Sequence, residues 1–344
     1  MMLMVNQKIY TPSISRLGVT IVITTIMLFA ALVYFHGFRG NLPYTLDPDE
    51  PVFYISAAEI RTTGLVRMNP LYPPLRFYEM VSEQIVLDVV SNYRATPMIY
   101  AVFSRIFSAY FALILLAVII RLGYELRNPF GGLCAAGVLA VDPQILTFTH
   151  VARGDTLSWM LTGCTILITL RLLKRESKYL WIGVILCALG ATLAKYSSAP
   201  ILLLPAYLIL TKAIPNYRIR WGVLIIGILV ASGILILIRA AANETSTWIL
   251  ERVGLKFLLN IQFNFQGNLQ KSLTTLFQGM GLAWVMIAIS ALPILVIWRR
   301  TLSSGVLKII ALLGSVVIST VFVFSFTVGR YHDMYIIVLI IAIF

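Results

Sequence analysis

Residues 17–50 read LGVTIVITTIMLFAALVYFHGFRGNLPYTLDPDE, an apolar run that leads into a cluster of acids. The run 17–36 is long enough for a helix that crosses the hydrocarbon core of a bilayer, which takes about 20 residues. Asp47, Asp49 and Glu50 then place three carboxylates within four positions. Acids packed this closely suit proton abstraction or cation binding. The simpler interpretation of the same segment is a solvent-exposed loop rich in Asp and Pro.

The composition of the whole chain is typical of a membrane protein. Of its 344 residues, 59 % are hydrophobic and only 12 % are charged, and the mean hydropathy is +0.90. We predict an all-α polytopic membrane protein, a bundle of about ten or more transmembrane helices forming one domain over 1–344. Because the sequence stops inside an apolar run, we expect the chain to continue past residue 344. The predicted spans are 17–36, 98–120, 131–149, 156–173, 180–195, 198–211, 221–239, 277–297, 306–327 and an incomplete one from 334.

The basic residues are distributed unequally between the two sides of this predicted bundle. With the N-terminus inside, the inner side holds 14 Lys and Arg against two acids, a net charge of +12. The outer side holds the remaining 13 bases against 12 acids, a net charge of +1. This is the sign of the positive-inside rule, and it accounts for the net charge of +13 without a nucleic-acid partner.

The three cysteines lie inside apolar segments at Cys134, Cys164 and Cys187. This placement predicts small core residues, with no disulfide and no metal knuckle. Two lone histidines, His150 and His332, show no spacing typical of a metal site.

The polar motifs all fall on the outer side, which predicts one outward-facing site. The first outer loop, 37–97, is long enough to hold two helices of its own, over 52–62 and 77–91, whose apolar spacing suits the membrane interface. A second outer loop, 240–275, mixes aromatic residues with Asn and Gln, as an interfacial anchor or a sugar-contacting flap does. The remaining outer motifs are Arg153-Gly154-Asp155, Lys195-Tyr196 and Arg330-Tyr331-His332-Asp333.

Several of these residues have two interpretations. Asp49 is the candidate base, with Asp47 as second choice and Glu50 as its neighbour. Asp155 follows a span, where it either acts in the site or caps the next helix. Lys195 and Arg330, at outer span ends, either snorkel to the interface or hold an anion.

Four motifs occur in one order along the chain and carry a resemblance to a known family. The motifs are the acids at 47–50 followed by a short helix, Tyr72-Pro73-Pro74-Leu75, Arg153-Gly154-Asp155, and Leu193-Ala194-Lys195-Tyr196. Their order resembles that of polyprenyl-phosphate-sugar-dependent membrane glycosyltransferases of the GT-C superfamily, and is similar to the branch with protein O-mannosyltransferases and the lipid A aminoarabinose transferase. The resemblance covers about residues 15–340.

The resemblance implies an all-helical GT-C-like bundle with interfacial helices in the first outer loop. It implies that Asp49 is the catalytic base, that Asp155 is the second outer-loop acid, and that Lys195 is the basic residue after the fifth span. One departure is Tyr72, where some lipid-modifying members have Lys before the Pro-Pro pair. Substrate choice therefore does not transfer from that subgroup.

The chemistry expected of such a site suits these residue types. A sugar on polyprenyl phosphate has a good leaving group, so the enzyme needs a base for the acceptor hydroxyl and cations for the departing phosphate. We predict catalytic roles for Asp49, Glu50 and Asp155, and inversion at the anomeric carbon. Lys195, Arg153 and Arg330 are the predicted phosphate-binding residues, Arg being suited to bidentate contact. We further predict that the substrate is positioned by Asp47, Tyr54, Tyr72 and Tyr196.

The partners and the rival functions follow from the same pattern. The donor is a polyprenyl-phosphate sugar, the acceptor a lipid, a glycan or a protein, and the membrane a prokaryotic plasma membrane rather than that of the endoplasmic reticulum. The sequence assigns no certain cofactor, and the paired acids leave a divalent cation possible. The alternatives are a transporter or flippase for a lipid-linked or anionic solute, which typically carries charges near the bilayer midplane, and a non-catalytic scaffold.

Overall fold

A computed structural model describes residues 16–37, 50–63, 74–91, 96–195, 198 and 201–213. Within these ranges the chain is helical and contains no strand. The predicted spans at 221–239, 277–297, 306–327 and from 334, and the loop 240–275, lie outside the described residues. The remaining predicted spans correspond to the helices α1 (Arg16–Phe35), α4 (Pro97–Glu125), α5 (Pro129–Val141) with α6 (Pro143–Thr149), α7 (Asp155–Lys174), α8 (Lys178–Ala194) and α9 (Leu203–Ala213).

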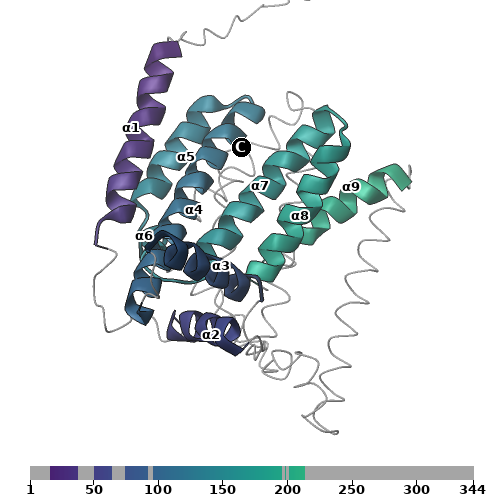
Figure 1. The fold of residues 1–344 in the computed structure, drawn as a ribbon. Helices are drawn as coiled ribbons and strands as arrows, with labels where there is room; N and C mark the ends of the chain where they lie inside the picture. Colours follow the sequence, from purple (N-terminus) through teal and green to yellow (C-terminus); the bar gives the residue numbers. More distant parts are fainter. Residues whose placement is uncertain are drawn as a thin grey trace, which may run out of the picture.

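The apolar helices form a bundle, with α1, α4, α5, α7 and α8 side by side (Figure 1). Within the described ranges, three stretches are long and apolar enough to cross a bilayer, namely Leu17–Phe35, Met98–Glu125 and Asp155–Lys174. The bent pair α5–α6 passes the same test if it is counted as one span, and α8 is a shorter apolar helix. The described chain is thus that of an all-helical membrane protein.

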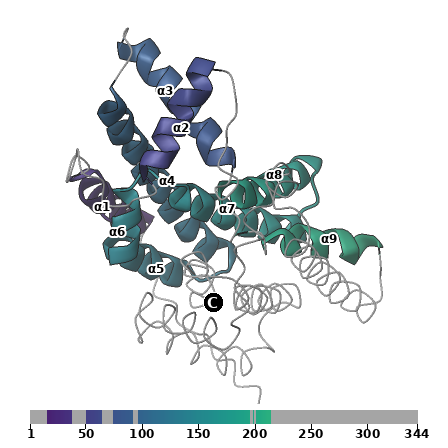
Figure 2. The same ribbon diagram turned by 90° about the horizontal axis from the view of Figure 1, so that it is seen from below.

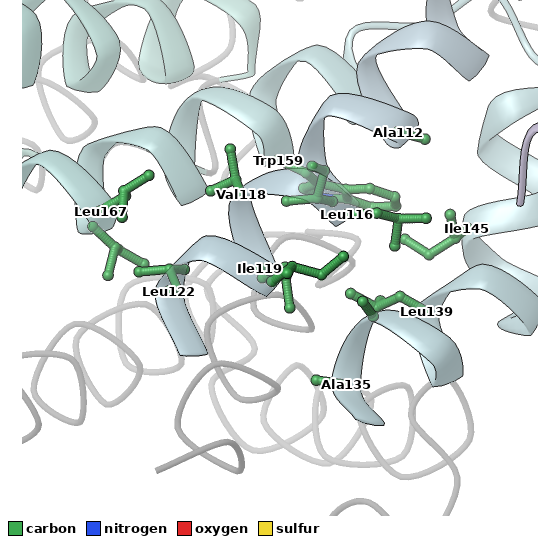
Figure 3. Close-up of a cluster of buried hydrophobic side chains, with 14 of the residues drawn as sticks. Ala112, Leu116, Val118, Ile119, Leu122, Ala135, Leu139, Ile145, Trp159 and Leu167 are labelled. Carbon is green, nitrogen blue, oxygen red and sulfur yellow. The ribbon is translucent and has the colours of Figure 1, made fainter. Parts of the chain in front are cut away.

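The core of the bundle lies between α4, α5 and α7 (Figure 3). Trp159 of α7 is fully buried there, and its ring meets that of Phe148 edge-on with centroids 5.2 Å apart. Small residues let the backbones approach closely, as is common between membrane helices. A Cβ at Gly123 of α4 would lie 2.6 Å from Cα of Gly132 in α5, so the core is closed by backbone contact at this point.

The segment 131–149, predicted as one span, is two helices that meet at an angle of 60°. The predicted span is therefore not one unbroken helix, and two adjacent residues account for the bend. Pro143 lacks the N–H that an uninterrupted helix would need, and the carboxylate of Asp142 accepts from the N–H groups of Gln144 and Ile145 at 2.9 and 3.1 Å. Asp142 therefore starts α6 as a new helix.

Two helices from the first outer loop, α2 (Glu50–Thr63) and α3 (Pro74–Ser91), lie across one end of the bundle (Figures 1 and 2). They confirm the helices predicted at 52–62 and 77–91, each beginning a few residues earlier. Phe53 and Phe77 pack with ring centroids 5.3 Å apart, and this small apolar cluster joins α2 to α3. The end of the bundle covered by α2 and α3 is where the candidate site lies.

Candidate functional site

Half of the predicted site residues are among those the structure describes. Asp47, Asp49, Tyr72, Tyr196 and Arg330 lie outside the described residues, and their roles stay predictions. The described ones are Glu50 and Tyr54 on α2, Arg153 and Asp155 at the start of α7, and Lys195 at the end of α8.

Asp155, Lys195 and Arg153 form one cluster at the α2–α3 end of the bundle. Helix α7 begins at Asp155 and α8 is followed directly by Lys195, so the antiparallel packing of the two helices brings their ends together. Lys195 Nζ donates to Oδ1 of Asp155, and Arg153 Nε lies 3.3 Å from Oδ2. The Asp155 side chain is only 3 % exposed, so both of its oxygens face cations in a largely buried setting.

Asp155 is not the N-cap residue of α7, but it lies in the first turn of that helix, where its charge complements the helix dipole. The N-cap position is held by Gly154, and no side chain caps that end. The carboxylate of Asp155 instead faces Lys195 from the first turn of the helix. The guanidinium of Arg153 also lies over the ring of Phe148, 6.0 Å from its centroid, which fixes its direction.

Gly154 is the point where the loop before α7 meets the end of α8 and the start of α3. A Cβ at this position would lie 2.7 Å from the carbonyl oxygen of Ala194 and 3.5 Å from Cβ of Arg76. The φ of Gly154 is −76°, which any residue adopts, so the requirement for glycine is one of space alone. The tight contact keeps Asp155 in reach of Lys195.

Gly154→Ala is therefore expected to lower the free energy of unfolding by about 1–3 kcal/mol, since the new methyl group forces the backbone of Ala194 away. The matched control is Gly137→Ala on α5, where a Cβ would meet nothing within 4 Å and helix propensity favours Ala by about 0.5–1 kcal/mol. The measurement is reversible unfolding in detergent, followed by tryptophan fluorescence. Equal stability of the two variants would contradict the close approach at Gly154.

Glu50 and Arg105 form a fully buried ion pair. Arg105 donates from Nε and Nη2 to the two carboxylate oxygens of Glu50, both at 2.7 Å, and both side chains are 0 % exposed. The N–H of Ala152 donates to the same carboxylate at 2.9 Å. The pair ties the first residue of α2 to the span α4 and to the loop before α7.

This geometry suggests a different role for Glu50 from the predicted catalytic one. Both of its oxygens are engaged by Arg105, and neither reaches solvent. We therefore interpret Glu50 as a positioning residue, which fixes the start of α2 directly after Asp49 in the sequence. Arg105 could not be identified as its partner from the sequence, because a lone Arg inside an apolar run carries no local sign of what it pairs with.

A second buried cluster surrounds Arg76 on α3. Arg76 is 0 % exposed, and its Nη1 donates to Glu79 and, at 3.3 Å, to Glu83. Its Nε and Nη2, the edge that would grip an anion in bidentate fashion, have no hydrogen-bond partner among the described residues. Arg76 lies next to Gly154, so its guanidinium group belongs to a residue that neighbours the Asp155 cluster.

Glu83 shares this cluster and accepts a hydrogen bond from Ser104 of α4. Burial raises the pKa of Glu83 well above its usual value, Arg76 opposes the rise, and Glu79 adds to it. Arg76, Glu79 and Glu83 are not among the site residues predicted from the sequence. The available signal was the spacing of 76, 79 and 83, which puts one cation and two acids on one helix face.

Tyr54 and a further ion pair hold α2 in place. The carbonyl oxygen of Tyr54 accepts from Gln84 of α3 at 3.1 Å. Burial, and then the charge of Glu50, raise the pKa of the Tyr54 phenol, which keeps it a neutral hydrogen-bonding group. Arg61 of α2 lies 2.6 Å from Asp88 of α3, a fixed frame beside the site.

A second cluster of charged residues lies at the opposite end of the bundle from the candidate site. There Glu125 at the end of α4 contacts Arg171 and Lys174 at the end of α7, at 3.1 and 2.8 Å. The described charged residues of α4, α7 and α8 thus lie near the ends of these helices. Arg105 is the exception, about two turns after the start of α4. Among the described residues, no group of three or more His, Cys, Asp or Glu side chains could hold a metal ion.

Comparison with known proteins adds no assignment to this geometry. No protein-family model matches the chain, and no curated protein matches it at a significant level.

Proposed function

We propose that the protein is an integral-membrane glycosyltransferase of the GT-C type, which moves a sugar from a polyprenyl phosphate to an acceptor hydroxyl. The observation that carries the proposal is the meeting of Asp155, Lys195 and Arg153 at the end of the bundle that α2 and α3 cover. The same end holds the start of α2, which Asp49 directly precedes in the sequence. The first residue of α2 thus lies at the same end of the bundle as the partly exposed cations Lys195 and Arg153.

In this mechanism Asp49 takes the proton from the acceptor hydroxyl as that oxygen attacks the anomeric carbon. The bond from the sugar to the phosphate oxygen breaks with inversion, and the polyprenyl phosphate leaves as an anion that needs no proton. The ion pair of Glu50 with Arg105 holds the start of α2 in one position. Fixed placement of the base matters because proton transfer requires hydrogen-bond reach to the hydroxyl.

Lys195 and Arg153 stabilise the negative charge of the departing phosphate. Both now face Asp155, and a phosphate that approaches them shares these cations with the carboxylate. Arg76 adds a buried guanidinium with its Nε–Nη2 edge unused by described residues. Cations aimed in advance at the leaving oxygen stabilise the transition state without reorganisation. Arg330 remains a further candidate for this role.

The position of the site relative to the membrane completes the proposal. The positive-inside rule assigns the side with the excess of basic residues to the cytoplasm, so in this proposal the α2–α3 end faces outward from a prokaryotic plasma membrane. There it meets lipid-linked donors and a lipid, glycan or protein acceptor. The mechanism with Asp49 as base and Lys195 and Arg153 as cations does not require a metal ion. If a divalent cation binds to the acids 47–50 instead, chelation with EDTA should abolish sugar transfer.

Replacing Lys195 by alanine tests the proposed phosphate contact. Loss of a hydrogen bond to a charged group costs about 1.5–3 kcal/mol, so Lys195→Ala should raise the KM for a polyprenyl-phosphate sugar by about 10- to 100-fold. Initial rates of sugar transfer at varied donor concentration measure this.

The matched control for that experiment is Lys178→Ala, at the other end of the same helix, where Lys178 lies over the ring of Tyr179. Lys178→Ala should leave the KM for the donor unchanged. An equal KM in the wild type and in Lys195→Ala would remove Lys195 from the phosphate site.

A further inference from the structure

The register between α7 and α8 places two cysteines opposite each other. The helices run antiparallel, and two close contacts define how they align. Leu161 Cδ1 lies 3.1 Å from where a Cβ on Gly190 would sit, and Ile168 Cδ1 lies 3.3 Å from the same point on Gly183. Each step forward on α7 between these contacts corresponds to one step back on α8.

Cys164 and Cys187 are the pair that this register brings together. Cys164 lies three residues after Leu161 and Cys187 three residues before Gly190, so the two occupy matching positions. Cys164 shares a helix face with Leu161 and Ile168, Cys187 shares one with Gly183 and Gly190, and both cysteines are free and partly exposed. The third cysteine, Cys134 on α5, is also free. The expectation of small core residues considered each cysteine by itself, and the pairing follows only from the packing of the two helices.

We propose that Cys164 and Cys187 form a redox-sensitive dithiol, which a lipid-soluble oxidant of the quinone class converts into a disulfide that links α7 to α8. The two S–H bonds break and one S–S bond forms. The two electrons and two protons reduce the quinone to its hydroquinone. A disulfide requires Cβ atoms about 4 Å apart, a separation that matching positions on two closely packed helices can reach.

The position of the two cysteines determines which oxidants can reach them and what the disulfide would do to the bundle. Cys164 is nine residues along α7 from Asp155, roughly 13 Å at the rise of an α-helix, which places the pair within the apolar part of the bundle. A lipid-soluble oxidant reaches it there, while a water-soluble one does not. The bond would hold closed the seam whose outer end carries Asp155 and Lys195.

The test uses the full chain in lipid nanodiscs and a short-chain ubiquinone as oxidant. After oxidation, free thiols are blocked with N-ethylmaleimide in SDS, disulfides are reduced, and the released thiols are counted by a maleimide–polyethylene glycol shift. We expect two released thiols in the wild type and in Cys134→Ser, and none in Cys164→Ser. Trypsin, which cuts between the two cysteines at Arg171 to Lys178, should leave two peptides that separate only on reduction.

Two results would overturn the proposal. One is the absence of released thiols in the oxidised wild type, and the other is a loss of release in Cys134→Ser, which would assign the disulfide to Cys134. Oxidised glutathione serves as the water-soluble comparison, and we expect no released thiols with it. Equal release with glutathione would contradict the placement of the pair within the apolar part of the bundle.

Discussion

Arg105→Met is expected to lower the free energy of unfolding by about 3–5 kcal/mol, because it leaves the carboxylate of Glu50 buried without its partner. Arg105 contacts both oxygens of Glu50 at 2.7 Å, and neither side chain has any solvent exposure. Methionine keeps most of the volume of the arginine, so the loss reports on charge rather than on a cavity. Reversible unfolding in detergent, followed by tryptophan fluorescence, measures it.

The matched control for this prediction lies on the same helix. Arg121 of α4 also pairs with a glutamate, Glu125 at 3.1 Å, but its side chain is 54 % exposed. Arg121→Met should cost about 0–1 kcal/mol, the usual value of an exposed ion pair. If Arg105→Met were no more destabilising than Arg121→Met, the buried pair would not be the anchor of α2.

A double variant separates the charge from the anchor. Glu50→Gln combined with Arg105→Met removes both charges, so the folded protein should recover most of the lost stability. Sugar transfer should remain low, since the start of α2 has lost the ion pair that fixes it. Recovery of transfer along with stability would show that the pair serves folding alone.

Asp49→Asn is expected to lower the rate of sugar transfer by about 10²- to 10⁴-fold, the usual contribution of a general base. Asparagine keeps the shape of aspartate but cannot accept the proton of the acceptor hydroxyl. The unfolding free energy should match that of the wild type, in contrast to the Arg105 variant. The two measurements together distinguish a chemical role from a structural one.

Asp47→Asn is the control for the choice of base, because it removes the neighbouring carboxylate two positions away. It should keep most of the transfer rate. Near wild-type turnover in Asp49→Asn, with a large loss in Asp47→Asn, would move the base to Asp47.

The helical architecture could be predicted from the sequence because hydropathy and helical spacing are local properties. Apolar runs gave the helices that the structure describes up to residue 213, and the spacing of apolar residues in the first outer loop gave α2 and α3. The bend between α5 and α6 was missed because the run 131–149 is predominantly apolar and holds a single charged residue, Asp142. There the capping carboxylate of Asp142 and the missing N–H of Pro143 outweigh hydropathy.

The candidate site could be predicted only in part, because its contacts join residues distant in sequence. The order of the polar motifs indicated that Arg153, Asp155 and Lys195 share one side, and the structure places them in contact. The partners of Glu50 and of the acids on α3 could not be found in this way. Arg105 pairs with a residue 55 positions away, and Arg76 adjoins the cluster only through the close approach at Gly154.

The measurement that tests the central claim most directly follows the fate of a radiolabelled sugar in proteoliposomes. A panel of polyprenyl-phosphate sugars is supplied with an acceptor extract on the outer side, and the wild type is compared with Asp49→Asn. The glycosyltransferase account predicts that label from one donor moves into acceptor with the wild type alone. Label that stays on its lipid and crosses the bilayer equally well in both proteins would contradict it and assign the protein to the transporters.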